Sequence, residues 1–196
     1  MDTGELFSLL KDRRTVRLYQ KKQIPRALVE KIIDAGRWAS SLHGFQPWKF
    51  FVVRKEETIK AIAGDAFNRS KKLYAGYNFI LRSTGETIAN APTVIVIYDK
   101  GLIQKKMNKM GGTYRKCAKI SEVQAISGAI QNMILMAHAL GVVSCWLVFP
   151  IFCEKAVNKL LGFDGQMIAM LTLGYPAEAG VRSARKPIDE TVGYVE

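Results

Sequence analysis

Two short segments carry residues whose types and spacing could bind a ligand. The first, Arg13-Arg14-Thr15-Val16-Arg17, places three guanidiniums within five residues. The planar fork of arginine binds phosphate through two parallel, charge-assisted hydrogen bonds, and the hydroxyl of Thr15 adds a neutral donor. The alternative is that these cations complement the C-terminus of the helix before them, which contributes about 0.3–1 kcal/mol. Taken alone, the segment leaves both interpretations open.

The second segment, residues 39–48, reads Ala-Ser-Ser-Leu-His-Gly-Phe-Gln-Pro-Trp and lies between a helical pattern and an apolar run. Small hydroxyl residues, a glycine and an imidazole are poor core material, and they let the backbone approach a flat polar ligand closely. Gln46 can both donate and accept, as the edge of an imide or pyrimidine requires. The alternative is a helix C-cap turn with His43 exposed. Together the two segments indicate a ligand with a phosphate at one end and a planar ring at the other.

The motifs of several other enzyme classes are missing from the sequence. There is no Gly-x-Gly-x-x-Gly after a strand, no Gly-x-x-x-x-Gly-Lys and no Gly-x-Ser-x-Gly. The two histidines, and three cysteines without a Cys-x-x-Cys pair, do not predict a hydrolase triad, a zinc site or a disulfide framework. We therefore expect no metal site. Cys145 lies in an apolar run and is expected to be a small buried hydrophobe.

Length and composition indicate one globular domain over residues 1–196, since 48% of the residues are hydrophobic and 23% are charged. No run of 18 apolar residues predicts a membrane span, and the first residues lack the features of a signal peptide, so we expect a cytoplasmic protein. The net charge of +12 favours anionic partners. No aromatic–basic stripe or nucleic-acid-binding motif accompanies it, so we expect no nucleic-acid binding.

The hydrophobic pattern predicts helices interspersed with four strands, which is an α/β or α+β domain whose strand order stays open. Thr3 is the expected N-cap of the first helix, and Pro25 fits the first turn of the second. Gly141 and Gly162 are expected just after helix ends. Helices are predicted over 3–13, 25–38, 56–63, 121–140 and 153–161, and strands over 48–54, 93–98, 142–149 and 166–174.

Three segments fall outside this regular pattern. Residues 65–90 are polar and basic with scattered aromatics, and they are predicted to be a mobile helical excursion or lid. Residues 99–118 are predicted to be a long basic loop, which inside a compact domain is often functional or disordered. The tail over 176–196 is too polar to be core and is expected to be extended.

Four segments, in order and spacing, resemble the nitroreductase family of FMN-dependent oxidoreductases. The family has an Arg-Arg-Ser-x-Arg-like run, a small-residue loop ending in Gln-Pro-Trp, a Gln-Asn helix ending in Ala-Leu-Gly before a Ser-Cys-Trp strand, and a Leu-Gly-Tyr-Pro strand end with an Arg-Lys-Pro tail. The matching residues here are 13–17, 40–48, 131–146, and 173–176 with 185–187.

The resemblance implies an α+β fold with helices flanking a central, mainly antiparallel sheet. It also implies an intertwined homodimer that holds FMN at its interface. By similarity, Arg13, Thr15 and Arg185 would hold the phosphate, helped by Arg14 or Lys186.

The same resemblance assigns the ring end of the ligand. Arg17 would lie near the pyrimidine end, where a cation fits because a reduced flavin gathers negative charge near N1 and the C2 carbonyl. Trp146 and Leu147 match the strand end that relatives lay against the isoalloxazine. Gln46 belongs to the ring-facing loop. The residues expected to line the ring and ribityl chain from the partner subunit are Ser40, Ser41 and His43.

The expected reaction is ping-pong transfer of electrons from NAD(P)H through FMN to a nitroaromatic, a quinone or a similar acceptor. Because the cofactor carries this chemistry, we assign no catalytic side chain as acid, base or nucleophile. Flavin-fragmenting or reductive dehalogenating chemistry on the same fold is an alternative, as is a flavin-binding protein with little turnover. Ser40 and Gly44 stand where many relatives have Pro and Asn, and Val148 stands in place of a usual glycine. With these departures, flavin binding is still expected, but the sequence does not determine the substrate.

Overall fold

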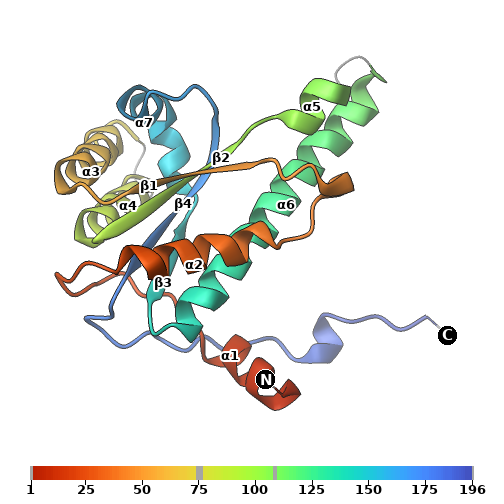
Figure 1. The fold of residues 1–196 in the computed structure, drawn as a ribbon, viewed down its shortest axis with the longest axis horizontal. Helices are drawn as coiled ribbons and strands as arrows, with labels where there is room; N and C mark the ends of the chain where they lie inside the picture. Colours follow the sequence, from red (N-terminus) through yellow and green to blue (C-terminus); the bar gives the residue numbers. More distant parts are fainter. Residues whose placement is uncertain (1, 74–76, 108–109, 196) are drawn as a thin grey trace.

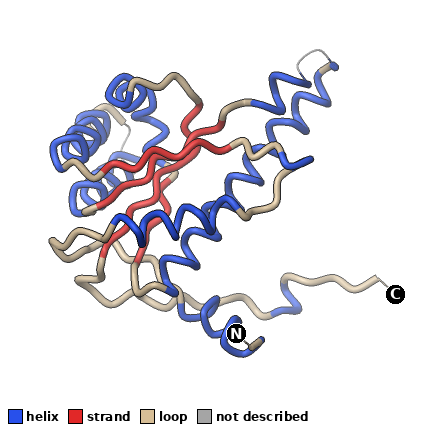
Figure 2. Tube along the Cα trace, viewed as in Figure 1, coloured by secondary structure: helices blue, strands red, loops and turns tan. Residues whose placement is uncertain are grey.

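The computed structural model describes residues 2–73, 77–107 and 110–195, which form a four-stranded antiparallel sheet with helices on both faces (Figure 1, Figure 2). The strand order is β1-β2-β4-β3, so β2 and β4 are central and the other two strands are edges. The predicted α+β class, with an antiparallel sheet flanked by helices, is confirmed. The four predicted strands are present as β1 (Trp48–Val53), β2 (Thr93–Asp99), β3 (Val143–Leu147) and β4 (Gln166–Gly174).

The central strand β2 explains how one sheet supports two cores. All seven of its residues are buried, and alternate side chains of a strand point to opposite faces. Val94, Val96 and Tyr98 pack into the core on one face. Ile95 and Ile97 pack into the core on the other. The first core is covered by α3 (Glu56–Ser70), α4 (Tyr77–Asn90) and α7 (Glu154–Leu161), and the second by α2 (Arg26–Arg37) and α6 (Gly112–Ala139) (Figure 1).

Residues 65–90 are helical, as predicted, and they form a structural layer. They contain the last part of α3, which continues past the predicted end at residue 63, and all of α4, while residues 74–76 lie outside the described ranges. Ala66, Leu81 and Ile88 are fully buried in the core beneath them. Polar and basic residues between these positions hide the helical repeat in the sequence. Whether the segment also closes over a ligand stays a prediction.

The prediction of a long basic loop over 99–118 is wrong. Apart from two residues outside the described ranges, the segment contains α5 (Leu102–Met107) and the beginning of α6, which starts at Gly112, earlier than predicted. The reason is a buried helical face. Ile103 is fully buried, and its amide donates to the carboxylate of Glu122 at 2.6 Å. Exposed lysines around this face mask it in the sequence.

The helix ends differ from the prediction in two places. α1 (Thr3–Asp12) is capped by Asp2 and not by Thr3: the Asp2 carboxylate accepts from the Glu5 amide at 2.7 Å, and the Glu5 carboxylate accepts from the Asp2 amide at 3.1 Å. This reciprocal pair satisfies two amides at once. Pro25 is the N-cap of α2, one position before its first turn. The predicted glycines after helix ends are confirmed by their left-handed φ angles: 71° at Gly141 and 61° at Gly162.

α1 and the C-terminal tail lie outside both cores, beside the end of α6 (Figure 1). α1 buries none of its residues, and the tail is exposed from residue 181 to 195, with one short 3-10 turn, η4 (Ile188–Glu190). The three cysteines are free, and Cys145 is buried as predicted. Across the part of the chain that the structure describes, no helix combines the length and apolarity needed to cross a bilayer.

Candidate functional site

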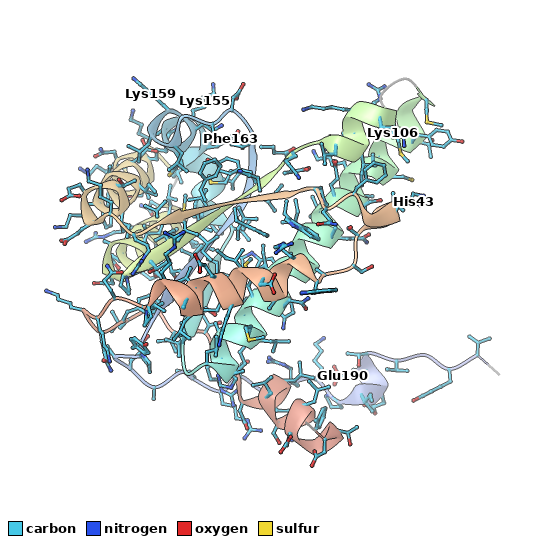
Figure 3. All side chains as sticks on the ribbon, in the orientation of Figure 1. His43, Lys106, Lys155, Lys159, Phe163 and Glu190 are labelled. Atoms are coloured by element: carbon cyan, nitrogen blue, oxygen red, sulfur yellow. The ribbon has the colours of Figure 1, made fainter. Side chains whose placement is uncertain are left out.

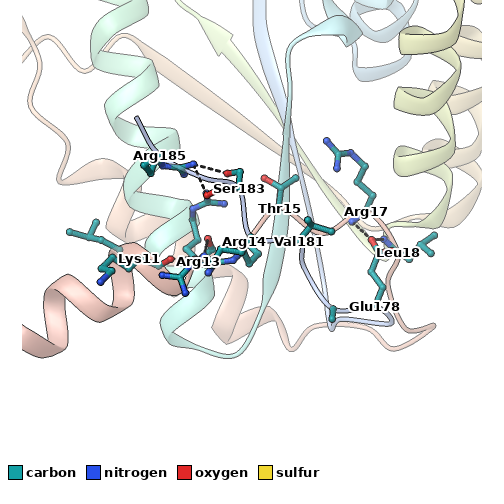
Figure 4. A pocket seen from close by; sticks show the side chains of 13 residues that line it. Lys11, Arg13, Arg14, Thr15, Arg17, Leu18, Glu178, Val181, Ser183 and Arg185 are labelled. Carbon is teal, nitrogen blue, oxygen red and sulfur yellow. Dashed lines mark hydrogen bonds between the residues drawn. The ribbon is translucent and has the colours of Figure 1, made fainter. Parts of the chain in front are cut away.

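An open pocket of about 560 Å³ lies between the segment that follows α1 and the C-terminal tail (Figure 4). The segment is extended because α1 ends at Asp12, and Thr15 then pairs in parallel with Ser144 in β3. The amide of Val16 donates to the Ser144 carbonyl at 3.2 Å, and the Val16 side chain is buried. Because alternate residues of an extended segment face opposite sides, burial of Val16 leaves Thr15 and Arg17 facing outward.

The tail completes the pocket because it is tied to the same segment. The carboxylate of Glu178 accepts from the amides of Arg17 and Leu18 at 3.0 and 3.1 Å. Further along, the tail passes so close to Arg14 that a Cβ added at Gly180 would lie 2.2 Å from the Arg14 Cβ. Only glycine fits this approach without displacing the tail. The tail then supplies the far wall of the pocket, which consists of Val181, Arg182, Ser183 and Arg185.

The pocket is strongly positive, and its charge is largely unpaired. Burial lowers the pKa of the half-buried Arg13, and the neighbouring charges of Arg14 and Arg185 lower it further. The acid in the pocket, Glu178, is engaged with backbone amides. Among the described residues, the guanidiniums of Arg13 and Arg17 have no hydrogen bond or ion pair. Cations crowded in this way are stabilised by a bound anion, and the arginine fork suits phosphate.

Two of the arginines are engaged within the chain. Nη1 of Arg14 donates to the carbonyls of Lys11 and Arg13, the latter at 2.8 Å, and so caps the C-terminus of α1. The helix-capping interpretation therefore holds for Arg14, whereas Arg13 remains available to a ligand. Nη1 of Arg185 donates to Oγ of Ser183 at 2.6 Å, which holds that guanidinium at the edge of the pocket (Figure 4).

A smaller hollow of about 230 Å³ begins at Arg17, which lines both spaces. In Figure 4 the guanidinium of Arg17 lies across Thr15 from the group formed by Arg13 and Arg185. One wall of the hollow is the end of β3, where Trp146 packs with the α2–α6 core and Leu147 with the opposite core. The structure thus brings Arg17 and the predicted ring-facing residues of β3 together. The other wall is supplied by α4 residues Phe79, Ile80, Ser83, Thr84 and Thr87.

The loop over 39–48 does not reach this pocket within one chain. It packs near the N-terminal half of α6, and Nζ of Lys106 in α5 lies 5.0 Å from the centre of the Phe45 ring. Figure 3 shows His43 at that end of α6, away from α1 and the tail. From Glu122, which contacts α5, to the last residue of α6 the helix axis runs about 25 Å at 1.5 Å per residue. Ser40, Ser41, His43 and Gln46 therefore stand apart from the arginines.

The loop has a strained conformation that presents its side chains outward. His43 and Gln46 both have φ of 47°, and Gly44 has φ of 69°. A left-handed conformation at a non-glycine residue costs on the order of 1–3 kcal/mol. The turn is held internally, because Ser41 Oγ accepts from the Gln46 amide at 3.2 Å and the Ser41 carbonyl accepts from the Gly44 amide at 3.0 Å. His43 and Gln46 are exposed, so within this chain their side chains face solvent.

The residues around the pocket differ from the sequence-based prediction in three places. Lys186 does not line the pocket, and its Nζ lies 3.8 Å from a Glu190 carboxylate oxygen. Sequence reasoning missed Glu178 entirely, since an isolated acid in a polar tail carries no signal. It also missed the α4 wall, although Phe79 among the aromatics of residues 65–90 was an available clue.

Comparison with known proteins gives a consistent result. The family model described as "Nitroreductase family" matches residues 10–175. The NADH dehydrogenase of Thermus thermophilus is 29% identical over 191 residues, covering 92% of this chain and 91% of that protein. Human iodotyrosine deiodinase 1 is 28% identical over 204 residues, covering 95% of this chain and 67% of that protein. The crystal structure, in complex with FMN, of a Desulfovibrio desulfuricans protein described as a nitroreductase superposes with a TM-score of 0.74 at 24% identity, covering 97% of this chain and 96% of that one.

Proposed function

Because the chain belongs to the nitroreductase family of FMN-dependent oxidoreductases, we propose that it oxidises NAD(P)H and passes the electrons to a nitroaromatic, a quinone or a similar acceptor in ping-pong fashion. Bound FMN supplies the hydride and electron chemistry, while the protein supplies binding, orientation and electrostatics. The observation that carries the proposal is the pocket of clustered arginines, of which Arg13 and Arg17 are unpaired. It continues, through Arg17, into the smaller hollow between β3 and α4, which we call the slot.

The residues of this pocket fit the two ends of FMN. Arg13 and Arg185 face the larger space from two chain segments and would hold the phosphate, with the exposed hydroxyl of Thr15 as a further donor. Arg14, occupied in capping α1, would contribute mainly by its charge. Arg17 would lie beside the pyrimidine end of the ring, where its charge offsets the negative charge that reduction creates.

The slot would hold the flat ring. The end of β3 offers backbone and the side chains of Trp146 and Leu147 against one face. Phe79 from α4 is largely exposed and stands at the mouth of the slot, where an aromatic acceptor would enter. Val148, in place of a usual glycine, narrows this entrance with an exposed branched side chain. In this arrangement the slot excludes water from one ring face and leaves the other open to substrate.

We propose that the active form is a homodimer. Leu6, Phe7 and Leu10 on α1 are exposed, and so are Trp38 at the end of α2 and Tyr194 in the tail. On α1, Leu6, Phe7 and Leu10 are spaced so that they share one face, and an exposed contiguous apolar face commonly marks an interface. The loop over 39–48, which lines neither the arginine pocket nor the slot of its own chain, would then face the slot of the partner subunit. Ser40, Ser41, His43 and Gln46 would line the ring and ribityl chain from there.

The purified protein tests this proposal directly. A yellow preparation that is bleached anaerobically by NADH or NADPH, and recovers its colour when a quinone or nitroaromatic is added, is the expected result. A protein that stays colourless and does not bind added FMN overturns it. Arg13→Ala should weaken FMN binding by about 10- to 100-fold, since it removes a charge-assisted hydrogen bond of about 1.5–3 kcal/mol. The control is Arg26→Ala, which removes an exposed arginine of α2 that pairs with Glu30.

The same preparation separates the alternative chemistries. The similarity to iodotyrosine deiodinase 1 makes a halogenated tyrosine a useful second acceptor. Release of halide from the reduced protein, without turnover of quinones or nitroaromatics, would favour reductive dehalogenation on the same flavin site. Flavin binding without any turnover would favour a binding protein.

A further inference from the structure

Two carboxyl groups are buried together at the end of the sheet, far from the pocket of arginines. Asp99, the last residue of β2, is 3% exposed, and Glu122 in α6 is fully buried. Nε2 of Gln104, from α5, donates to Oε2 of Glu122 at 2.7 Å and to Oδ2 of Asp99 at 3.2 Å. The two carboxylates also accept hydrogen bonds from backbone amides of this region: the Gly101 amide donates to Asp99 at 2.8 Å, and the Ile103 amide donates to Glu122 at 2.6 Å.

These contacts join α5 and the N-terminal half of α6 to the sheet, and they lie at the base of the loop over 39–48. Trp48, which ends the loop, pairs with Asp99 across β1 and β2. The amide of Lys100, next to Asp99, donates to the Pro47 carbonyl at 2.8 Å. Lys106 of α5 covers the ring of Phe45. A displacement of α5 would therefore reach the loop through two independent contacts.

The electrostatics of the pair are unusual for such a buried place. Within the described residues no cation lies within 4.0 Å of either carboxyl. Lys100, Lys105 and Asp164 line the open hollow beside Asp99, and no ion pair joins them to it. Burial raises the pKa of Asp99 to about 6, and Glu122 raises it through both its charge and a hydrogen bond, against the lowering effects of the Gly101 amide and Gln104.

The direction of the coupling follows from this shift. A carboxyl whose pKa is raised in the folded arrangement stabilises that arrangement when it is protonated, below its ordinary pKa. The stabilisation is lost as the pH rises through the raised value. The packing of α5 on α6 should therefore be more stable near pH 5 than at pH 8.

We propose that Asp99 and Glu122 are positioning residues for the loop over 39–48, and that a proton held between their carboxyls keeps α5, α6 and the loop in the arrangement that completes the flavin site of the partner subunit. The proposal rests on the proposed function only for its last clause. Protonation then makes flavin affinity higher in acid, although neither carboxyl touches the flavin.

Hydrogen exchange of the protein without flavin tests whether a proton on the Asp99–Glu122 pair holds α5 in place. Between pH 5 and pH 8 the protection of amides 101–107, after correction for intrinsic exchange, should fall by about tenfold in the wild type. Asp99→Asn keeps an acceptor for Gly101 and offers a permanent donor to Glu122, so its protection should stay high at both values. Asp164→Asn, which alters an exposed acid of the adjoining hollow, should behave as the wild type. Glu122→Gln, which removes the second charge, provides another variant that should flatten the pH dependence.

FMN titrations at the same two pH values test whether the pair, through the loop over 39–48, affects flavin binding. The dissociation constant should rise toward pH 8 in the wild type and in Asp164→Asn, by up to about tenfold, and stay level in Asp99→Asn. Equal pH dependence of protection in the wild type and Asp99→Asn overturns the role of the pair. Altered protection with unchanged flavin affinity overturns the link to the loop. Absence of flavin binding at either pH refutes the proposed function, and the exchange result then decides by itself whether the pair holds α5 in place.

Discussion

A flavin site divided between two copies of the chain makes a sharp prediction for mixed dimers. One copy carries Arg13→Ala with Arg185→Ala, which removes the guanidiniums expected to hold the phosphate. The other carries Ser40→Tyr, which adds a bulky side chain to an exposed loop position with no hydrogen bond of its own among the described residues. Each variant alone should form a dimer whose two sites are both defective. In the hybrid, both defects fall in one site and the other site is intact.

The expected magnitude follows from the arginines. Each charge-assisted hydrogen bond contributes about 1.5–3 kcal/mol, so loss of both weakens binding by at least about 100-fold. FMN at about ten times the wild-type dissociation constant then fills nine-tenths of intact sites and fewer than about a tenth of sites without the arginines. A hybrid purified through two different tags should therefore bind about one FMN per dimer, and each variant homodimer close to none.

Flavin absorbance of the doubly purified hybrid measures this stoichiometry, with thermal unfolding of each variant as a check on folding. Hybrids without flavin, while the wild type binds two per dimer, would show that the loop and the arginines of one chain serve the same site and refute the division between subunits. Full occupancy in the Ser40→Tyr homodimer would show instead that the loop does not line the site.

Two further predictions concern the cores and the thiols. Gly36→Ala would place a Cβ 2.8 Å from Cγ of the buried Met133 and 3.2 Å from the Ala129 carbonyl, so it should lower the free energy of unfolding by about 1–3 kcal/mol. The Cβ of Gly64→Ala in α3 would meet nothing within 4 Å, so this variant should raise the free energy of unfolding by about 0.5–1 kcal/mol. Urea titrations that rank the two variants the other way would contradict the packing described. Burial, reinforced by Asp65, raises the pKa of Cys153 to about 12. In the folded protein at pH 8, Cys153 and the buried Cys145 should therefore not react with a thiol reagent, whereas the exposed Cys117 should react. Labelling of either buried cysteine before unfolding, located by mass spectrometry, would contradict their burial.

The elements that could be predicted are those whose signal is local. The four strands are short apolar runs rich in β-branched residues, and β2 is buried on both faces because Ile95 and Ile97 serve one core while Val94 and Val96 serve the other. α5 is not predicted because it has one buried residue, Ile103, and is also held by hydrogen bonds to the distant Glu122 and to Asp99, which leave no periodic apolar pattern. A fully buried acid contradicts the ordinary expectation for a charged residue, so no local rule places it.

The candidate site shows why residue type alone leaves a role undecided. Arg13 and Arg14 are adjacent and identical in chemistry, and the sequence left phosphate binding and helix capping equally open for both. The direction in which the chain leaves Asp12 separates them: Arg14 turns back to the carbonyls of Lys11 and Arg13, whereas Arg13 faces the tail. That tail is held at the pocket by contacts of long range: Glu178 accepts from amides more than 150 residues away along the chain, and the Ala177 amide donates to the Leu18 carbonyl. Helix capping thus applies to Arg14, whereas phosphate binding stays a prediction for Arg13.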